Sequence, residues 1–566
     1  MPTVKLRIAS AQINPVVGDI GGNSALILDA IAQAHNLGAQ ALLFPEMAMT
    51  GYPVEDLALR PAFRKASMAA VQQIATAAER SGVGEMLIVL GYLDEESVGS
   101  ATEPQNAIAL IHRGKVAAKY IKRHLPNYGV FDEFRNFKAG SGTLVVRCCG
   151  VDIGVAICED IWQDSGVVPE LAARKPGLVL VANASPYERK KDDIRLALVQ
   201  KRAREFGAPL FYVNQTGAQD DLVFDGDSIV VDSRGEVVAR APQFETSIFA
   251  TDIEVQSATS KPDLDLACDY QPMKSSIPLM SAPRLSDEEE IWSALVMGLG
   301  DYVRKNGFTS VALGLSGGID SALVATIAVD ALGKSKVVGV SLPSKYSSDH
   351  SLSDAKTLAT NLGIDYRVIE IEPVVQSFLA ATTLTGIAEE NVQARVRGSL
   401  LMGLSNQEGH LILATGNKSE LAVGYSTLYG DAVGGFAPIK DIFKVDVWRL
   451  ARWRNQVAKS RGEIEPIPVN SIEKEPSAEL RPGQKDSDSL PEYPLLDQLL
   501  DIYVEKNGDA VEIVKAGFEK SLVDRVITLV DRAEYKRRQY PPGTKVSAIA
   551  FGKDRRLPMT SRWKES

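Results

Sequence analysis

The sequence predicts an α/β protein with two or more domains, one of which contains a doubly wound parallel sheet. A chain of 566 residues is longer than one ordinary hydrophobic core accommodates. Short apolar segments alternate with helical patterns along the chain, which is typical of strands buried between helices. In the second half, a glycine-rich loop at 314–321 follows an apolar strand and opens a helix, as in doubly wound folds.

The first half begins with a predicted strand at 4–13 and a helix at 23–37 whose apolar residues recur on one face. Gly38 closes the helix, and a short buried strand follows at 41–46. Further apolar strands are predicted at 86–93, 106–111, 151–158, 177–184 and 209–214. Because helical patterns lie between many of these strands, we expect the strands in the interior.

The second half opens with a helix that Ser286 and Glu289 start as a capping box and that Gly307 ends. Strands are predicted after it at 310–315, 336–342, 365–371 and 410–416. Their alternation with helices predicts a parallel sheet whose ligands bind beyond the carboxyl ends of the strands.

Residues 256–285 carry four prolines and little periodicity, and we interpret them as a linker or as an extended segment on a domain surface. The domains are therefore expected at 1–255 and 286–566. A second polar segment, 471–492, predicts a mobile loop within the later domain.

The composition excludes several classes of protein. No apolar run approaches the ~18 residues that span a bilayer, and the start of the chain lacks a signal-peptide core. The net charge of −10 argues against a general nucleic-acid binder. Cys148, Cys149, Cys158 and Cys268 show no metal-ligand spacing and no disulfide framework, so we expect a reducing, cytoplasmic environment.

The loop "GLSGGIDS" at 314–321 suits the binding of nucleotide phosphates. Its glycines allow close approach of the backbone, while the hydroxyls of Ser316 and Ser321 and the following helix N-terminus offer donors. Asp320 would repel bare phosphate, so it is better explained as a Mg²⁺ ligand. The spacing matches neither the P-loop pattern nor G-x-G-x-x-G.

This loop resembles that of the ATP pyrophosphatases, which adenylate a substrate and release pyrophosphate. The segments 390–407, 413–444 and 534–543, among them "ENVQARVRGSLLMGLSNQ" and "EYKRRQYPPG", resemble the NAD synthetase family over roughly 286–560. The resemblance implies an adenine nucleotide alpha hydrolase-like fold and a homo-oligomer. It also implies that ATP activates the nicotinate carboxylate of deamido-NAD and that ammonia then displaces AMP.

The same resemblance assigns binding residues. ATP would contact Gly314, Leu315, Ser316, Gly317, Gly318, Ile319, Asp320, Ser321, Thr415 and Lys444. Deamido-NAD would contact Asn391, Glu420 and Lys536, with Arg395 and Asp431 as further candidates. Asp320 and Glu420 would hold Mg²⁺.

Three motifs in the first half, "FPE", "YxKxHL" and "CED", supply the groups needed to release ammonia from glutamine. Cys158 is a candidate nucleophile and Glu46 a candidate general base, and Lys122 offers a cation for the developing oxyanion. Together they resemble the Glu-Lys-Cys amidase domain of the nitrilase family over roughly 4–255, which implies an α-β-β-α sandwich. The resemblance also implies that Tyr128, Ser185 and Lys191 bind glutamine, with Lys191 where the family commonly has arginine.

Cys158 is followed directly by Glu159 and Asp160, whose charges would disfavour a thiolate. We hypothesise that Lys122 offsets them and keeps the sulfur anionic.

The two resemblances together imply NAD synthesis with glutamine as nitrogen donor and an internal passage for ammonia. Two alternatives stay open. One is another adenylating enzyme, either an amidotransferase or a sulfur-transferring RNA-modifying enzyme. The other is a non-enzymatic binding or sensing protein that has kept both pockets.

Overall fold

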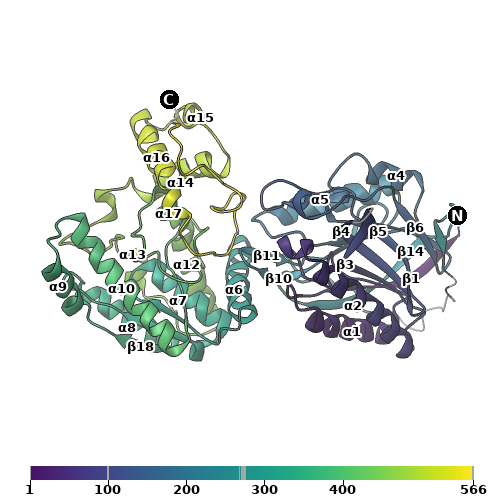
Figure 1. Cartoon of the computed structure of the whole chain (residues 1–566), viewed down its shortest axis with the longest axis horizontal. Coiled ribbons are helices and arrows are strands. Elements are labelled where there is room, and N and C mark those ends of the chain that lie inside the picture. Colours follow the sequence, from purple (N-terminus) through teal and green to yellow (C-terminus); the bar gives the residue numbers. More distant parts are fainter. Residues whose placement is uncertain (1, 99–100, 267, 269–275, 564–566) are drawn as a thin grey trace. The chain divides into compact units, whose positions relative to one another are not determined.

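The computed structural model describes residues 2–563 apart from 99–100, 267 and 269–275. The chain divides into two compact units. The first comprises residues 1–219 and 223–285, and the second comprises 220–222 and 286–566. Figure 1 shows the first unit in purple and blue and the second in teal, green and yellow.

Two β-sheets face each other in the first unit, and residues such as Leu43, Val89, Val155 and Leu180 pack between them. The first sheet contains, in spatial order, β14 (Ser247–Gln256), β1 (Thr3–Gln12), β2 (Ala41–Leu43), β3 (Leu87–Val98), β4 (Ala101–His112) and β5 (Lys115–Ile121). The second contains β13 (Val237–Arg240), β12 (Ile229–Val231), β9 (Leu210–Asn214), β8 (Leu178–Asn183), β7 (Val151–Ile157), β6 (Leu144–Cys148) and β15 (Leu264–Asp265).

Helices cover the outer face of each sheet. Ile27 and Ile74, from α1 (Ile20–Asn36) and α2 (Pro61–Arg80), pack on the first sheet. Leu171 and Val199, from α4 (Val167–Ala173) and α5 (Lys191–Phe206), pack on the second. The predicted α-β-β-α sandwich is therefore confirmed. The shorter elements are η1 (Glu55–Leu59), α3 (Glu133–Asn136), η2 (Cys158–Ile161), β10 (Thr216–Gln219) and β11 (Leu222–Asp225).

The second unit contains the predicted parallel sheet. Its order is β18 (Asp365–Val368), β17 (Val337–Ser341), β16 (Val311–Gly314) and β19 (Leu411–Ile412). The early helices are α6 (Asp287–Lys305), α7 (Ile319–Leu332), η3 (Lys334–Lys336), α8 (Asp349–Leu362), α9 (Glu372–Ala381) and α10 (Ile387–Glu408). The later helices are α11 (Lys418–Val423), α12 (Lys444–Ser460), α13 (Val469–Glu473), η4 (Asp486–Asp488), α14 (Tyr493–Leu500), η5 (Asp501–Glu505), α15 (Ala510–Lys515), α16 (Lys520–Arg532) and α17 (Glu534–Arg537).

Residues 256–285, expected as a linker or a surface segment, belong to the first unit. Within them β15 adds a short parallel strand to β6, with Leu264 opposite Val146. The part 269–275 and residue 267 lie outside the described residues. No helix among the residues that the structure describes is long and apolar enough to cross a bilayer.

The prediction that the cysteines form no disulfide is wrong. Cys148 and Cys268 form one, with a Cα–Cα distance of 5.6 Å, whereas Cys149 and Cys158 are free. The pairing joins residues 120 positions apart, so the spacing along the chain gave no sign of it.

Candidate active sites

The structure brings Glu46 and Lys122 together at the ends of strands in the first unit. Glu46 follows β2 and Lys122 follows β5, both in the first sheet, while Cys158 follows β7 in the second. A close backbone approach makes this possible, because a Cβ atom on Gly91 of β3 would lie 2.2 Å from the carbonyl oxygen of Pro45. Only glycine fits there without moving the loop that carries Glu46.

Lys122 is fully buried and contacts two carboxylates. Its Nζ lies 2.7 Å from Glu46 Oε1 and 2.8 Å from Glu133 Oε1. Burial alone would lower the pKa of Lys122, but the charges of Glu133 and Glu46 outweigh it and raise the pKa well above its ordinary value. The ammonium is therefore charged throughout the physiological range.

Glu46 is also buried and is fixed by two donors besides Lys122. The Nδ2 of Asn106 donates to Oε1 at 2.7 Å, and the backbone N–H of Ala184, just after β8, donates to Oε2 at 3.0 Å. Groups from both sheets thus hold the carboxylate in one orientation, as a general base requires.

Cys158 sits in a strained turn. Its φ of +40° lies in the left-handed region, which costs a residue with a side chain of order 1 kcal/mol or more. Burial raises the pKa of the Cys158 thiol well above its usual range, and Glu46 raises it further, while Lys122 lowers it. Because burial and Glu46 outweigh Lys122, the pKa of Cys158 is not lowered, as the hypothesis that Lys122 keeps the sulfur anionic requires.

The two acids after Cys158 have other partners. Asp160 accepts from the backbone N–H of Ile157 and His124 and from the hydroxyl of Tyr120. It thereby ties the turn carrying Cys158 to the segment carrying Lys122.

Glu159 accepts from the Tyr128 hydroxyl at 2.9 Å and from Gln163 Nε2 at 2.6 Å. Tyr128 is 56% exposed, as suits a residue at the mouth of a site. Ser185 is buried just after β8, and its backbone N–H donates to Asn214 Oδ1 at 2.8 Å. Lys191 is the first residue of α5.

A cavity of about 310 Å³ lies at the carboxyl end of β16 in the second unit. Seven of the eight residues of the 314–321 loop line it, as do Thr415 and Lys444. The exception, Gly317, has φ +76°, and a Cβ there would lie 2.3 Å from the backbone oxygen of Ser351. Glycine at this position lets the loop turn under α8.

Asp320 and Glu420 meet in this cavity, where both pair with Lys444. The Asn417 side chain donates to Asp320 Oδ1 at 2.9 Å and accepts from the backbone N–H of Glu420 at 3.0 Å. Burial, together with the charge of Asp320, raises the pKa of Glu420 to about 8. Two carboxylates that share one ammonium are a donor set suited to a divalent cation.

The residues expected to bind deamido-NAD divide into two groups. Asp431 and Glu420 line the cavity, whereas Asn391 and Lys536 do not. Lys536 Nζ donates to the backbone oxygens of Gly424 and Ser426 at 2.7 Å each.

Asn391 Oδ1 accepts from the Thr427 hydroxyl at 2.8 Å. Both Asn391 and Lys536 therefore fix the 424–427 segment, whose residues Tyr425, Ser426 and Thr427 line the cavity. Arg395 is exposed, and its Nε donates to the backbone oxygen of Leu428 at 3.2 Å.

Comparison with known proteins decides the family. The carbon-nitrogen hydrolase family model matches residues 7–263, and the NAD synthase model matches 291–540. The glutamine-dependent NAD(+) synthetase of Thermotoga maritima is 43% identical, with 99% of each chain covered. The chain belongs to the glutamine-dependent NAD(+) synthetases. The enzyme class and activity expected from the sequence, a ligase that makes NAD⁺ with glutamine as nitrogen donor, are thereby confirmed.

Solved structures of glutamine-dependent NAD(+) synthetases agree with this family. The enzyme from Acinetobacter baumannii, in complex with ADP, is 38% identical with a TM-score of 0.74, and all of both chains is covered. That from Cytophaga hutchinsonii, 22% identical, has the same fold with a TM-score of 0.81 over 99% of this chain and 98% of that one.

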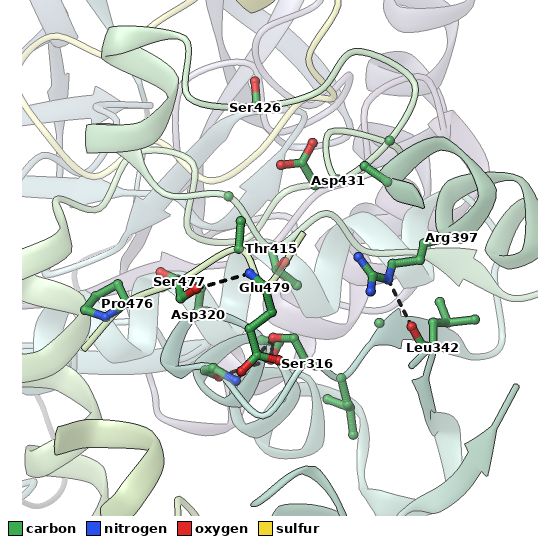
Figure 2. Close-up of a pocket in the computed structure, with 18 of the residues that line it drawn as sticks. Ser316, Asp320, Leu342, Arg397, Thr415, Ser426, Asp431, Pro476, Ser477 and Glu479 are labelled. Carbon is green, nitrogen blue, oxygen red and sulfur yellow. Dashed lines mark hydrogen bonds between the residues drawn. The ribbon is translucent and has the colours of Figure 1, made fainter. Parts of the chain in front are cut away.

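Several residues at the two sites of this NAD(+) synthetase were not predicted. Glu133 lies at the end of the segment that carries Lys122, but a lone glutamate in a loop is usually solvated, so no local signal marked it. Residues 474–480, expected in a mobile loop, line the cavity, and Glu479 accepts from the hydroxyls of Ser348 and Ser351. Figure 2 shows Glu479 and Arg397 among the lining side chains, with Arg397 donating to the Leu342 carbonyl oxygen at 2.9 Å.

Proposed function

We propose that residues 1–255 hydrolyse glutamine at Cys158 and that residues 286–566 use the ammonia to amidate deamido-NAD⁺. The observation that supports this most directly is the buried Lys122 ammonium, which Glu46 and Glu133 share beside the strained Cys158. A buried acid–cation pair next to a thiol matches the needs of amide hydrolysis and has no obvious structural use.

In the first reaction, Glu46 takes the thiol proton as the sulfur attacks the side-chain amide carbon of glutamine. Because the thiol is protonated at rest, this transfer accompanies the attack. The C–N bond breaks, and Glu46 returns the proton to the departing ammonia. Glu46 then deprotonates water, which cleaves the γ-glutamyl thioester to glutamate and restores the thiol. Lys122 stabilises the oxyanion in both halves.

Glutamine is held at this site by Tyr128, Ser185 and Lys191. Tyr128 and Glu159 form a hydrogen-bonded pair at the exposed side of the site. Lys191 would pair with the substrate carboxylate through a single ammonium charge, without the two parallel hydrogen bonds that an arginine makes.

In the second reaction, a nicotinate carboxylate oxygen attacks the α-phosphorus of ATP, and pyrophosphate leaves. Ammonia then adds to the acyl carbon, AMP leaves, and the surplus proton passes to solvent. The loop 314–321, Thr415 and Lys444 would hold ATP, and Lys444 would offset charge on the leaving pyrophosphate. Glu420 would contact deamido-NAD⁺, while Asn391 and Lys536 would support the segment that lines its pocket.

Asp320 and Glu420 would hold Mg²⁺, which when bound offsets phosphate charge and orients the nucleotide. Their fit to the ion rests on the two cavity-lining carboxylates, which stand close enough to share Lys444.

The test compares two nitrogen donors on the full-length enzyme. Cys158→Ala is expected to abolish NAD⁺ synthesis from glutamine but to leave synthesis from added ammonium largely intact, whereas Asp320→Ala impairs both. Cys149→Ala, which removes the other free cysteine, serves as the control. If folded Cys158→Ala lost both activities, the division of labour would be wrong.

We further propose that ammonia passes from one reaction to the other without mixing with bulk ammonium. Synthesis from unlabelled glutamine in ¹⁵N-ammonium should give unlabelled NAD⁺, and heavy labelling would exclude such transfer.

A homo-oligomer is also proposed, because exposed Phe378 and Val374 lie one turn apart on α9, shortly before exposed Ile387 in the sequence. Light scattering tests it. ATP and glutamine as substrates are consistent with a cytoplasmic location.

A further inference from the structure

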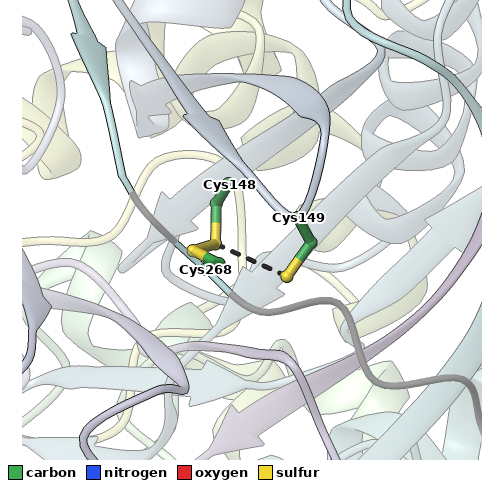
Figure 3. A group of neighbouring side chains, drawn as sticks. All are labelled: Cys148, Cys149 and Cys268. Carbon is green, nitrogen blue, oxygen red and sulfur yellow. Dashed lines mark hydrogen bonds between the residues drawn. A yellow bond between two sulfur atoms is a disulfide. The ribbon is translucent and has the colours of Figure 1, made fainter.

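Three of the four cysteines lie close together in the first unit, with a histidine beside them. The sulfur atoms of Cys148, Cys149 and Cys268 all lie within 4.8 Å of one another. The Nε2 of His112 lies 3.7 Å from Cys268 Sγ. Figure 3 shows Cys148 bonded to Cys268, with Cys149 turned toward the pair.

These four side chains come from three separate parts of the chain. His112 ends β4, Cys148 ends β6, Cys149 lies in the turn that follows, and Cys268 follows β15. His112, Cys148 and Cys149 are buried, and Cys268 is partly buried. The turn at Cys149 is in the left-handed region, with φ +51°, which directs its side chain back toward Cys148.

Two of the distances between these atoms match those between neighbouring ligands of a tetrahedral metal site. With zinc–sulfur bonds near 2.3 Å and zinc–nitrogen bonds near 2.0 Å, neighbouring ligands lie about 3.8 Å apart for two sulfurs and about 3.5 Å apart for sulfur and nitrogen. The Cys148–Cys149 sulfur distance is 3.8 Å and the Cys268–His112 distance is 3.7 Å. Two separate pairs of the four groups thus already stand at ligand-to-ligand distances.

We propose that Cys148, Cys149, Cys268 and His112 form a binding site for one thiophilic divalent cation of the Zn²⁺ type. The cation binds when the Cys148–Cys268 disulfide is reduced. Reduction by a low-molecular-weight thiol adds two electrons and two protons, and the reductant leaves as its own disulfide. Zn²⁺ then replaces the three thiol protons, which pass to solvent, and takes a lone pair from the imidazole.

The site differs in kind from the Asp320–Glu420 pair. Soft sulfur ligands select Zn²⁺ over Mg²⁺, while carboxylates favour Mg²⁺. Four protein ligands leave no position open for substrate, so the cation has a structural role. It would attach the β15 segment to β6 in a reduced chain, as the disulfide does in an oxidised one.

The test uses the full-length enzyme, reduced with a phosphine and freed of metal with a chelator. In a titration with Co²⁺, we expect one equivalent of the metal to bind per chain. The bound ion should show sulfur-to-cobalt charge-transfer absorption and the visible bands of tetrahedral cobalt. Zn²⁺ should remove both signals, and Mg²⁺ should not. Cys149→Ser should lose the charge-transfer signal or bind Co²⁺ at least about tenfold more weakly. His112→Gln should show the same kind of effect, but a smaller one. Cys158→Ser, which removes a cysteine elsewhere, should retain one equivalent.

Circular dichroism would establish that each variant is folded. Absence of the charge-transfer band in the reduced wild type, or an unchanged band in both Cys149→Ser and His112→Gln, would overturn the proposal. The proposal would also be overturned if enzyme oxidised with diamide bound cobalt as well as the reduced enzyme does, since a disulfide sulfur cannot replace a thiolate. If the Cys148–Cys268 disulfide persisted under phosphine and no metal bound, the proposal would be wrong and the cluster would serve only to form the disulfide.

Discussion

Glu133 and Glu46 share one ammonium, because Lys122 Nζ lies 2.8 Å from the first and 2.7 Å from the second. The hydroxyl of Tyr52 also donates to Glu133, at 2.8 Å. Burial raises the pKa of Glu133 to about 7, even though Lys122 lowers it. Glu133 therefore changes charge close to neutral pH, and the orientation of Lys122 depends on it.

Glu133→Gln is expected to lower kcat/KM for glutamine-driven synthesis by roughly 10²–10³, the usual effect of disturbing an oxyanion-stabilising group. Synthesis from ammonium should be unchanged, since the amide replaces a group of the first unit only. Steady-state rates with each donor measure this, and Glu254→Gln on the exposed side of β14 is the control. Equal losses with both donors would contradict the assignment.

The raised pKa of Cys158 predicts slow alkylation of the free enzyme at neutral pH. Only the thiolate reacts with iodoacetamide, so the rate at Cys158 should climb with pH and reach half its maximum above pH 9, the ordinary thiol value. Peptide mass spectrometry separates Cys158 from Cys149, whose pKa burial raises to about 11. A midpoint below pH 8 would restore the idea of a resting thiolate.

Asp160→Asn should damage the glutaminase reaction through position rather than charge. The carboxylate accepts from the backbone N–H of Ile157 and His124 and from the Tyr120 hydroxyl, and an amide oxygen cannot serve them all. We expect about 1–3 kcal/mol lower stability and a lower glutamine kcat, with ammonium-driven turnover retained. Urea unfolding and two-donor kinetics measure both effects.

The control is Glu159→Gln, which changes the neighbouring acid and keeps an acceptor for Tyr128. If Glu159→Gln lowered stability as much as Asp160→Asn, the role given to Asp160 would be incorrect.

Glu420→Gln is expected to stabilise the ligand-free enzyme at alkaline pH. In the folded chain the pKa of Glu420 is about 8 against an ordinary 4.5, so the folded state holds the proton more tightly than the unfolded one. Wild-type stability therefore falls as pH rises from about 4.5 to 8. The variant lacks this loss, and its Tm should exceed that of the wild type by several degrees at pH 8.5 and by little at pH 5.

Calorimetry in chelator measures the difference, and Glu492→Gln, at an exposed position before α14, is the control. A Tm difference that is the same at both pH values would show that Glu420 is ionised in the folded state throughout.

The main elements and some of the site could be predicted because their signals are local. Glu46 and Cys158 each follow an apolar strand, Lys122 lies in a short motif, and the 314–321 loop lies between a strand and a helix. Strand limits shifted by a few residues: the predicted strand at 410–416 shortens to Leu411–Ile412, since the following backbone turns to form the cavity wall.

The rest depends on packing that no local pattern carries. Glu133 contacts Lys122 only because folding buries the two side chains together, and the pKa of Cys158 is raised by burial and by Glu46. Likewise His112 and Cys268 are 156 positions apart, and only the pairing of β15 with β6 brings Cys268 back to Cys148.

Lys444 pairs with both Asp320 and Glu420, and this has a consequence for the turnover cycle. When a nucleotide binds with its cation, Lys444 exchanges a carboxylate partner for a phosphate. The two carboxylates, Asp320 and Glu420, are then free to pair with the cation. Such a swap of partners changes the number of satisfied charges little in either direction. The electrostatic free energies of nucleotide binding and of pyrophosphate release are thus nearly balanced. Pyrophosphate can therefore leave the pocket as readily as ATP enters it.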